Sequence, residues 1–128
     1  MNESSAELAR GWIEAWTRMD LRWLRERLAP DFVHTSPFGR LEGRESYLET
    51  VEPLARKSVQ ELDIKQIIAT GDQAAVWFEN RTASGIVPSC DWIRTRDGLI
   101  TEIQSFYDSE KVREVLSPDE QRELDGSR

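Results

Sequence analysis

The sequence predicts an α+β fold: three N-terminal helices packed in the concave face of a curved, mostly antiparallel sheet, forming a cone-shaped α+β barrel. Apolar residues recur at helical spacing in the first half of the chain, and strand-like segments separated by turn dipeptides fill the second half. The 128 residues suffice for one hydrophobic core. We therefore expect a single domain over residues 1–116 and a mobile C-terminal tail over residues 117–128 that carries a short helix.

Helical periodicity begins near the N-terminus. Asp20 is placed to divide the first apolar stripe into two helices, because its side chain can cap the second. Ala29-Pro30-Asp31 is expected to end that second helix. A third helix is expected from about Arg44 to about Lys57. The two stripes consist of Leu8, Trp12, Trp16, Met19 and Trp23, and of Tyr47, Leu48, Val51 and Leu54.

Strand patterns fill the remainder. A short strand is expected over residues 32–36, where Pro37 and Gly39 stop it. Ser117-Pro118-Asp119-Glu120 has the pattern of a helix start and predicts a short helix to about Leu124. Four longer strands, joined by hairpin turns at Gly71-Asp72, Ser84-Gly85 and Asp97-Gly98, are expected over residues 59–70, 74–84, 86–96 and 99–107.

Composition excludes several classes of protein. A net charge of −7 argues against nucleic-acid and anionic-membrane partners, whose binders carry basic patches. No apolar run approaches the ~20 residues of a membrane-spanning helix, and residues 1–5 lack the features of a signal peptide. Cys90 is the only cysteine, so we expect a cytoplasmic protein without disulfides. One histidine and one cysteine, with no glycine-rich phosphate loop, predict neither metal nor cofactor.

Asp91 opens an apolar strand, although strand interiors disfavour aspartate. It shares a strand face with Ser89, Ile93 and Thr95, so apolar neighbours should raise its pKa. Three interpretations follow. Neutral Asp91 could donate to a substrate carbonyl or enolate, ionised Asp91 could orient His34, or Asp91 could form a salt bridge at the sheet edge.

His34 is the only histidine. Strand alternation places it on one face with Phe32 and Ser36. An imidazole in a pocket can act as a general base near neutral pH. The alternative is a histidine that hydrogen-bonds the backbone at a strand end.

Five tryptophans predict either a well-filled core or a pocket for a flat molecule. Trp12 and Trp16 lie one helical turn apart, so both can face the sheet, Trp16 by plain packing and Trp12 by donating its indole N–H into a pocket. Tyr47 is a candidate pocket hydroxyl. With Val76 and Phe78 inside, Trp77 and Trp92 would lie on the outer sheet face, which predicts a homodimer formed sheet on sheet.

Three passages resemble the nuclear transport factor 2-like superfamily, in particular its SnoaL-like, polyketide cyclase-like and ketosteroid isomerase-like members. Residues 12–21 are similar to the family's first helix and the break after it, with Met19 where glycine is usual. Residues 28–37, followed by Gly39 and Gly43, are similar to its strand-to-helix crossing, and residues 91–108 to its last two strands. The resemblance implies that residues 1–116 form one SnoaL-like domain with an interior pocket.

The comparison with ketosteroid isomerases carries over three positions. Asp91 falls where that family has its oxyanion-stabilising aspartate, Ser36 where it has the catalytic base, and Trp12 where it has the oxyanion tyrosine. Serine is too weakly basic to abstract a carbon-bound proton unaided. The same comparison implies that Ser105 and Tyr107 on the last strand face the cavity.

Two functions remain open. The first is a cofactor-free enzyme, an isomerase, cyclase or dehydratase acting on an apolar carbonyl compound, in which His34 moves a proton and Asp91 stabilises the oxygen. Trp12, Trp16, Ser36, Tyr47, Ile93, Ser105 and Tyr107 would bind the substrate. The second is a non-catalytic small-molecule-binding or dimerisation module of the same fold.

Overall fold

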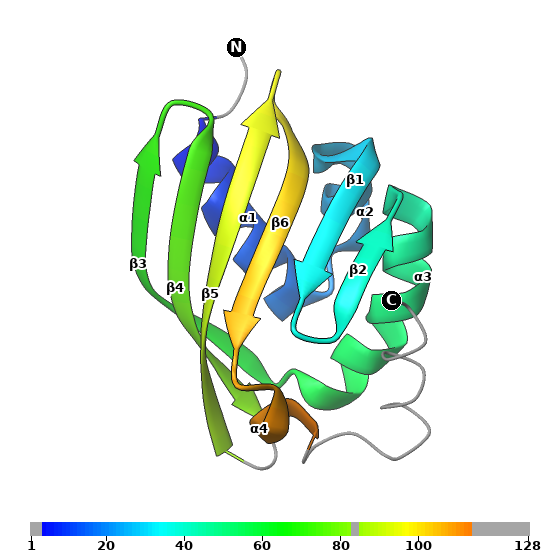
Figure 1. Ribbon diagram of the computed structural model, residues 1–128, viewed down its shortest axis with the longest axis vertical. Helices are drawn as coiled ribbons and strands as arrows, with labels where there is room; N and C mark the ends of the chain where they lie inside the picture. Colours follow the sequence, from blue (N-terminus) through cyan, green and yellow to red (C-terminus); the bar gives the residue numbers. More distant parts are fainter. Residues whose placement is uncertain (1–3, 83–84, 114–128) are drawn as a thin grey trace.

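The computed structural model describes residues 4–82 and 85–113 (Figure 1). Within these residues, four helices and six strands follow one another in the order that the sequence predicts, with a strand over residues 39–42 and a short helix over residues 109–113 in addition. The elements are α1 (Ser5–Arg18), α2 (Leu21–Arg27), β1 (Leu28–Ser36), β2 (Gly39–Glu42), α3 (Arg44–Ser58), β3 (Glu61–Thr70), β4 (Gln73–Thr82), β5 (Gly85–Arg96), β6 (Leu99–Tyr107) and α4 (Ser109–Arg113).

The six strands form one sheet in the order β2-β1-β6-β5-β4-β3. Only the β1–β6 pair is parallel, and the other neighbours are antiparallel. The helices α1, α2 and α3 lie on one face of the sheet, with α1 across β3 and β4 and α3 beside β1 and β2 (Figure 1). The predicted α+β fold, with helices against a mostly antiparallel sheet, is confirmed.

Local signals explain the helix boundaries. Ser4 and Glu7 form a capping box at the start of α1. Met19 ends α1 in the left-handed conformation with φ of 55°, a conformation that glycine adopts most readily. The Asp20 carboxylate then accepts a hydrogen bond of 3.0 Å from the backbone N–H of Trp23, so the predicted cap between the two helices is confirmed.

The β1–β2 region departs from the prediction. β1 begins at Leu28, directly after α2, because Leu28 pairs with Ile100 of β6, and an irregularity between Leu28 and Val33 accommodates Pro30. Gly39 does not stop the sheet either: β2 pairs with β1 and forms a hairpin that the sequence analysis missed. The helix expected after Ser117 lies outside the described residues.

The core fills the space between the helices and the concave sheet face. Val76 and Phe78 of β4 are buried, whereas Trp77 is 52% exposed, so the predicted orientation of this strand is confirmed. α1 contributes Trp12 and Trp16, both almost fully buried. No helix among the described residues is long and apolar enough to span a membrane.

Candidate active site

A cavity of about 200 Å³ lies between α1, α3 and the concave face of the sheet, with α4 adding to its wall. Its wall is mainly apolar and aromatic, with a few polar side chains on β1, β4, β5 and β6. Ile93 is the one predicted site residue outside this wall: it is fully buried in the core, two positions beyond Asp91 on the same strand face. The other predicted residues that line the cavity are Trp12, Trp16, His34, Ser36, Tyr47, Asp91, Ser105 and Tyr107.

Asp91 is held by α1. The Trp12 indole N–H donates a buried hydrogen bond of 2.8 Å to Asp91 Oδ2. Because an indole has a single N–H, Trp12 has no donor left for a ligand, contrary to the role expected from the sequence. Asp91 forms no ion pair with any of the described residues, so the salt-bridge interpretation of this carboxylate is wrong there.

Ser105 connects Asp91 with His34. Asp91 of β5 and Ser105 of β6 are direct cross-strand partners, both side chains are buried, and the Ser105 hydroxyl is one of the influences that lower the pKa of Asp91. On its other side, Ser105 Oγ lies 2.9 Å from Nε2 of His34 on β1. His34 and Asp91 therefore both neighbour Ser105, and among the described residues no direct hydrogen bond joins His34 to Asp91.

Burial shifts the pKa values of the two titratable groups in opposite directions. It raises the pKa of Asp91 from 3.8 to about 6, although the hydrogen bonds from Trp12 and Ser105 oppose the rise. It lowers the pKa of His34 from 6.5 to about 4. The imidazole is surrounded by rings, including that of Tyr47 with its centroid 5.0 Å away. At neutral pH, His34 is therefore neutral and Asp91 is mostly ionised.

Two tyrosine hydroxyls face the same cavity. Burial and the Asp91 charge raise the pKa of Tyr47 well above 10, and the opposing influence of Trp16 is smaller. Burial also raises the pKa of Tyr107 to about 12, although the nearby Ser36 hydroxyl opposes the rise. Both hydroxyls stay protonated at neutral pH, so each can donate a hydrogen bond to a ligand oxygen.

Asn80 of β4 is a cavity-lining residue that the sequence analysis did not single out. Its Oδ1 is buried and has no hydrogen-bond partner among the described residues. The alternation that placed Val76 and Phe78 on the inner face would also have placed Asn80 there. Within the described part of the chain, no group of three His, Cys, Asp or Glu side chains could hold a metal ion.

Helices packed in the concave face of a curved sheet, around an interior cavity, define the nuclear transport factor 2-like superfamily. Within it, this chain belongs to the SnoaL-like domain family, whose family model matches residues 9–103. Among curated proteins, none matches this chain.

Solved structures match over nearly the whole chain. IdmH, a proposed polyketide cyclase from Streptomyces antibioticus, has a TM-score of 0.77 and 22% identity over 88% of this chain and 97% of its own. An NTF2-like protein of unknown function from Cytophaga hutchinsonii has a TM-score of 0.76 and 16% identity over 88% and 97%. A proposed ketosteroid isomerase from Kribbella flavida has a TM-score of 0.72 and 20% identity over 81% and 77%. Identities this low establish the fold alone.

Proposed function

We propose that this protein is a cofactor-free enzyme that moves a proton next to the carbonyl group of a small apolar compound. Isomerisation, cyclisation and dehydration all use such a step. The observation that carries the proposal is Asp91: a carboxylate buried in the wall of an apolar cavity, held at 2.8 Å by the Trp12 N–H, with a pKa of about 6. A general base works best when its pKa lies near the operating pH.

The order of the two pKa values favours Asp91 as the base. His34 is the base expected from the sequence, but a histidine with a pKa of about 4 is a weaker base than a carboxylate with a pKa of about 6. Neutral imidazole can instead donate a hydrogen bond to a developing oxyanion. The hydroxyls of Tyr47 and Tyr107 are further donors for that oxygen.

The cavity size supports a one-ring or two-ring substrate. Its volume of about 200 Å³ is somewhat larger than an engineered cavity of about 150 Å³ that binds benzene. It is smaller than the roughly 300 Å³ at which pockets for drug-sized ligands begin. Apolar side chains from α3, including Val51 and Leu54, make up much of the wall. We therefore propose small cyclic ketones as the substrate class.

Hydrogen exchange tests this proposal without knowledge of the natural substrate. Tetralone or cyclohexenone is incubated with the protein in deuterated water, and NMR measures deuterium uptake at the carbon beside the carbonyl. Asp91→Asn should slow the catalysed exchange about 100-fold or more. The matched control is Asp97→Asn, the same change at an exposed turn residue with φ of 53°, a conformation that asparagine adopts readily. Equal exchange by wild type and Asp91→Asn would contradict the proposal.

A second candidate function is a non-catalytic small-molecule-binding module. Ser36 favours it, because this residue occupies the position where ketosteroid isomerases have their base. Its hydroxyl also already accepts a hydrogen bond of 3.1 Å from the Phe38 N–H. Binding of the same ketones without exchange above the background rate would support this module over the enzyme.

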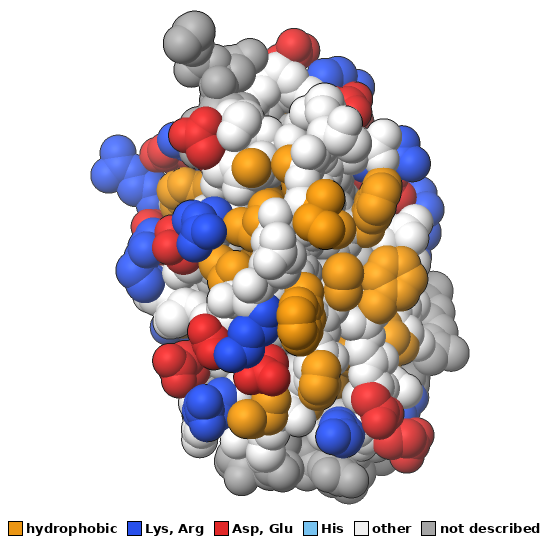
Figure 2. Space-filling view, turned by 90° about the vertical axis from the view of Figure 1, so that its left-hand side faces the viewer, with side chains coloured by type: hydrophobic (Ala, Val, Ile, Leu, Met, Phe, Trp, Pro, Cys, Tyr) orange, Lys and Arg blue, Asp and Glu red, His pale blue; other side chains and the backbone are white. Residues whose placement is uncertain are grey.

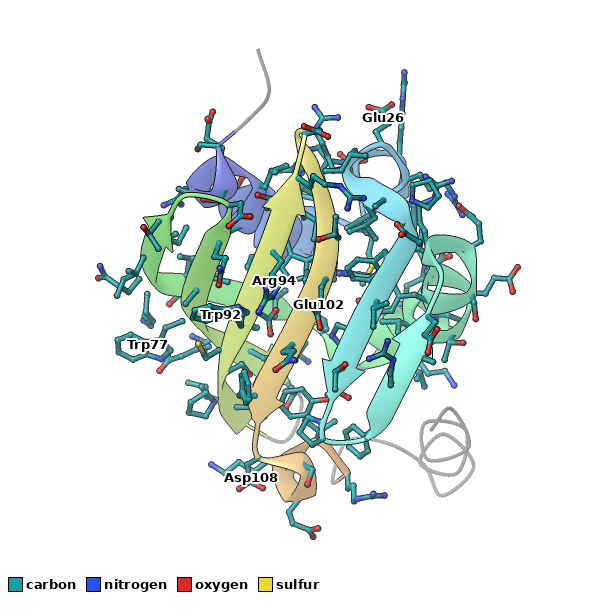
Figure 3. All side chains as sticks on the ribbon, turned by 45° about the horizontal axis from the view of Figure 1, so that its top comes forward. Glu26, Trp77, Trp92, Arg94, Glu102 and Asp108 are labelled. Atoms are coloured by element: carbon teal, nitrogen blue, oxygen red, sulfur yellow. The ribbon has the colours of Figure 1, made fainter. Side chains whose placement is uncertain are left out.

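We also propose that the protein forms a homodimer through the outer face of the sheet. Trp77 is 52% exposed, Trp92 40% and Phe106 56%, and both tryptophans project from the sheet away from the helices (Figure 3). Hydrophobic side chains also gather among charged ones on the β3 and β4 side of the molecule (Figure 2). Exposed apolar patches of this kind often mark interfaces between proteins.

The cytoplasmic location expected from a single cysteine stays a prediction. Cys90 lies on the outer side of β5, next to Asp91, and burial raises the pKa of its thiol. A thiol with a raised pKa is less reactive toward oxidants at neutral pH, which suits a protein kept in the reduced form.

A further inference from the structure

Ser105 lies between two titratable groups that do not touch each other. Ser105 is the partner of Asp91 across the β5–β6 ladder, and it contacts His34 on the neighbouring strand β1. Ser105 is buried, with 9% of its surface exposed. The Asp91 carboxyl and Nε2 of His34 can therefore both hydrogen-bond the Ser105 hydroxyl. From the sequence alone, Ser105 is expected only to be a polar residue of the substrate pocket.

The hydroxyl of Ser105 has one proton, so it can donate to only one of these two neighbours at a time. When Asp91 is ionised, the carboxylate can only accept, and Ser105 donates to it. The Ser105 oxygen then accepts from His34, which requires the proton of the neutral imidazole on Nε2. When Asp91 is protonated, its O–H can donate to Ser105, and Ser105 donates to an unprotonated Nε2. The imidazole proton is then on Nδ1.

We propose that Ser105 is a positioning residue that couples the tautomer of His34 to the protonation state of Asp91. The coupling itself does not depend on the proposed function, and only its role rests on that proposal. That role is to set the tautomer of His34 for each half of a proton-transfer cycle. The proton balance is simple. Asp91 gains one proton, from substrate or solvent, while neutral His34 keeps one proton and exchanges its position between Nε2 and Nδ1.

The surroundings keep this coupling separate from other titrations. The Tyr47 ring packs against His34, and the Asp91 charge helps to raise the pKa of Tyr107, so both tyrosines stay protonated at neutral pH. Burial also lowers the pKa of His34 to about 4, below the value of about 6 for Asp91. Near pH 5, a protonated Asp91 therefore faces a neutral His34.

Asp91→Asn should mimic the protonated state at every pH. The amide oxygen keeps the Trp12 N–H, and the amide NH2 can donate to Ser105 as the protonated carboxyl does. Ser105 would then donate to Nε2 of His34, and the imidazole proton would be held on Nδ1.

The experiment is nitrogen-15 NMR of the imidazole, which reports the tautomer directly. The chain has one histidine, so the signals need no assignment. In the wild type we expect the Nε2–H form at about pH 8 and a shift toward the Nδ1–H form at about pH 5. Asp91→Asn should show the Nδ1–H form at both pH values, whereas Asp97→Asn should behave as wild type.

Removal of the hydroxyl then tests the role of Ser105. In Ser105→Ala, adding Asp91→Asn should no longer change the tautomer, while Ser105→Thr, which keeps a hydroxyl, should restore the response. A merely structural serine would alter stability without uncoupling the two groups. The inference is overturned if the tautomer is the same in wild type and Asp91→Asn, or if the response survives in Ser105→Ala. Because these spectra need no substrate, their outcome is independent of the deuterium-exchange test of the proposed function.

Discussion

Replacing Asp91 by Asn is expected to stabilise the protein at neutral pH while removing the proposed base. Burial raises the pKa of Asp91 from 3.8 to about 6, so ionisation costs the folded state more than the unfolded state. The stability that the protonated carboxyl contributes is fully present below pH 3.8 and is lost as the pH rises through about 6. This difference in pKa corresponds to about 3 kcal/mol at neutral pH.

Urea unfolding of wild type and Asp91→Asn between about pH 3 and about pH 8 measures this effect. The asparagine side chain at position 91 is uncharged at every pH in this range, and its amide oxygen can still accept a hydrogen bond from the Trp12 N–H. The difference in unfolding free energy should therefore move by about 3 kcal/mol in favour of the variant as the pH rises. Asp97→Asn, an exposed change of the same kind, should leave the wild-type pH dependence intact.

Two results would refute this reasoning about Asp91. One is a stability difference between wild type and Asp91→Asn that stays constant across the pH range, because the Asp91 carboxyl would then have the same pKa in the folded and the unfolded protein. The other is a variant that becomes less stable than wild type as the pH rises, because the charge would then stabilise the fold. The expected pattern, greater stability with lost exchange activity, is typical of substitutions at active sites.

Three further predictions address other parts of the molecule. His34→Gln should show the opposite pH dependence in urea unfolding. Because the pKa of His34 is about 4 in the folded protein, the wild type loses about 3 kcal/mol of unfolding free energy as the pH falls from 6.5 through about 4, and the variant avoids this loss. Asn80→Leu should raise the unfolding free energy by about 1 kcal/mol, because it removes a buried oxygen without a partner among the described residues, and a less stable variant would contradict this. Trp77→Arg should convert the proposed homodimer to a monomer in analytical ultracentrifugation, and a wild-type protein that is already monomeric would contradict the interface.

The parts of the fold that follow from local chemistry were predictable from the sequence. The Asp20 cap is a contact between residues three apart. The alternation on β4 buries Val76 and exposes Trp77 because one face of this sheet is covered by helices. The β1–β2 hairpin was not predictable in the same way, because β1 is held in the sheet by its distant parallel partner β6, which outweighs the breaker signal of Pro30.

Most residues that line the site could be predicted from the sequence, but the contacts between them could not. Parity along single strands placed His34 and Asp91 on inner faces. The Trp12–Asp91 bond joins residues 79 positions apart, and the His34–Ser105 contact joins residues 71 apart, so neither partner can be read from local pattern. The order of the two pKa values depends on burial by several elements at once, which only the assembled fold supplies.

The central claim is that burial makes Asp91, rather than His34, the stronger base in one coupled site. The most direct measurement is an NMR pH titration of the single histidine in wild type and in Asp91→Asn. We expect a midpoint near 4, together with a smaller step near pH 6 that disappears in Asp91→Asn. A midpoint close to 6.5 that Asp91→Asn leaves unchanged would contradict the account, because His34 would then be solvated and uncoupled from Asp91.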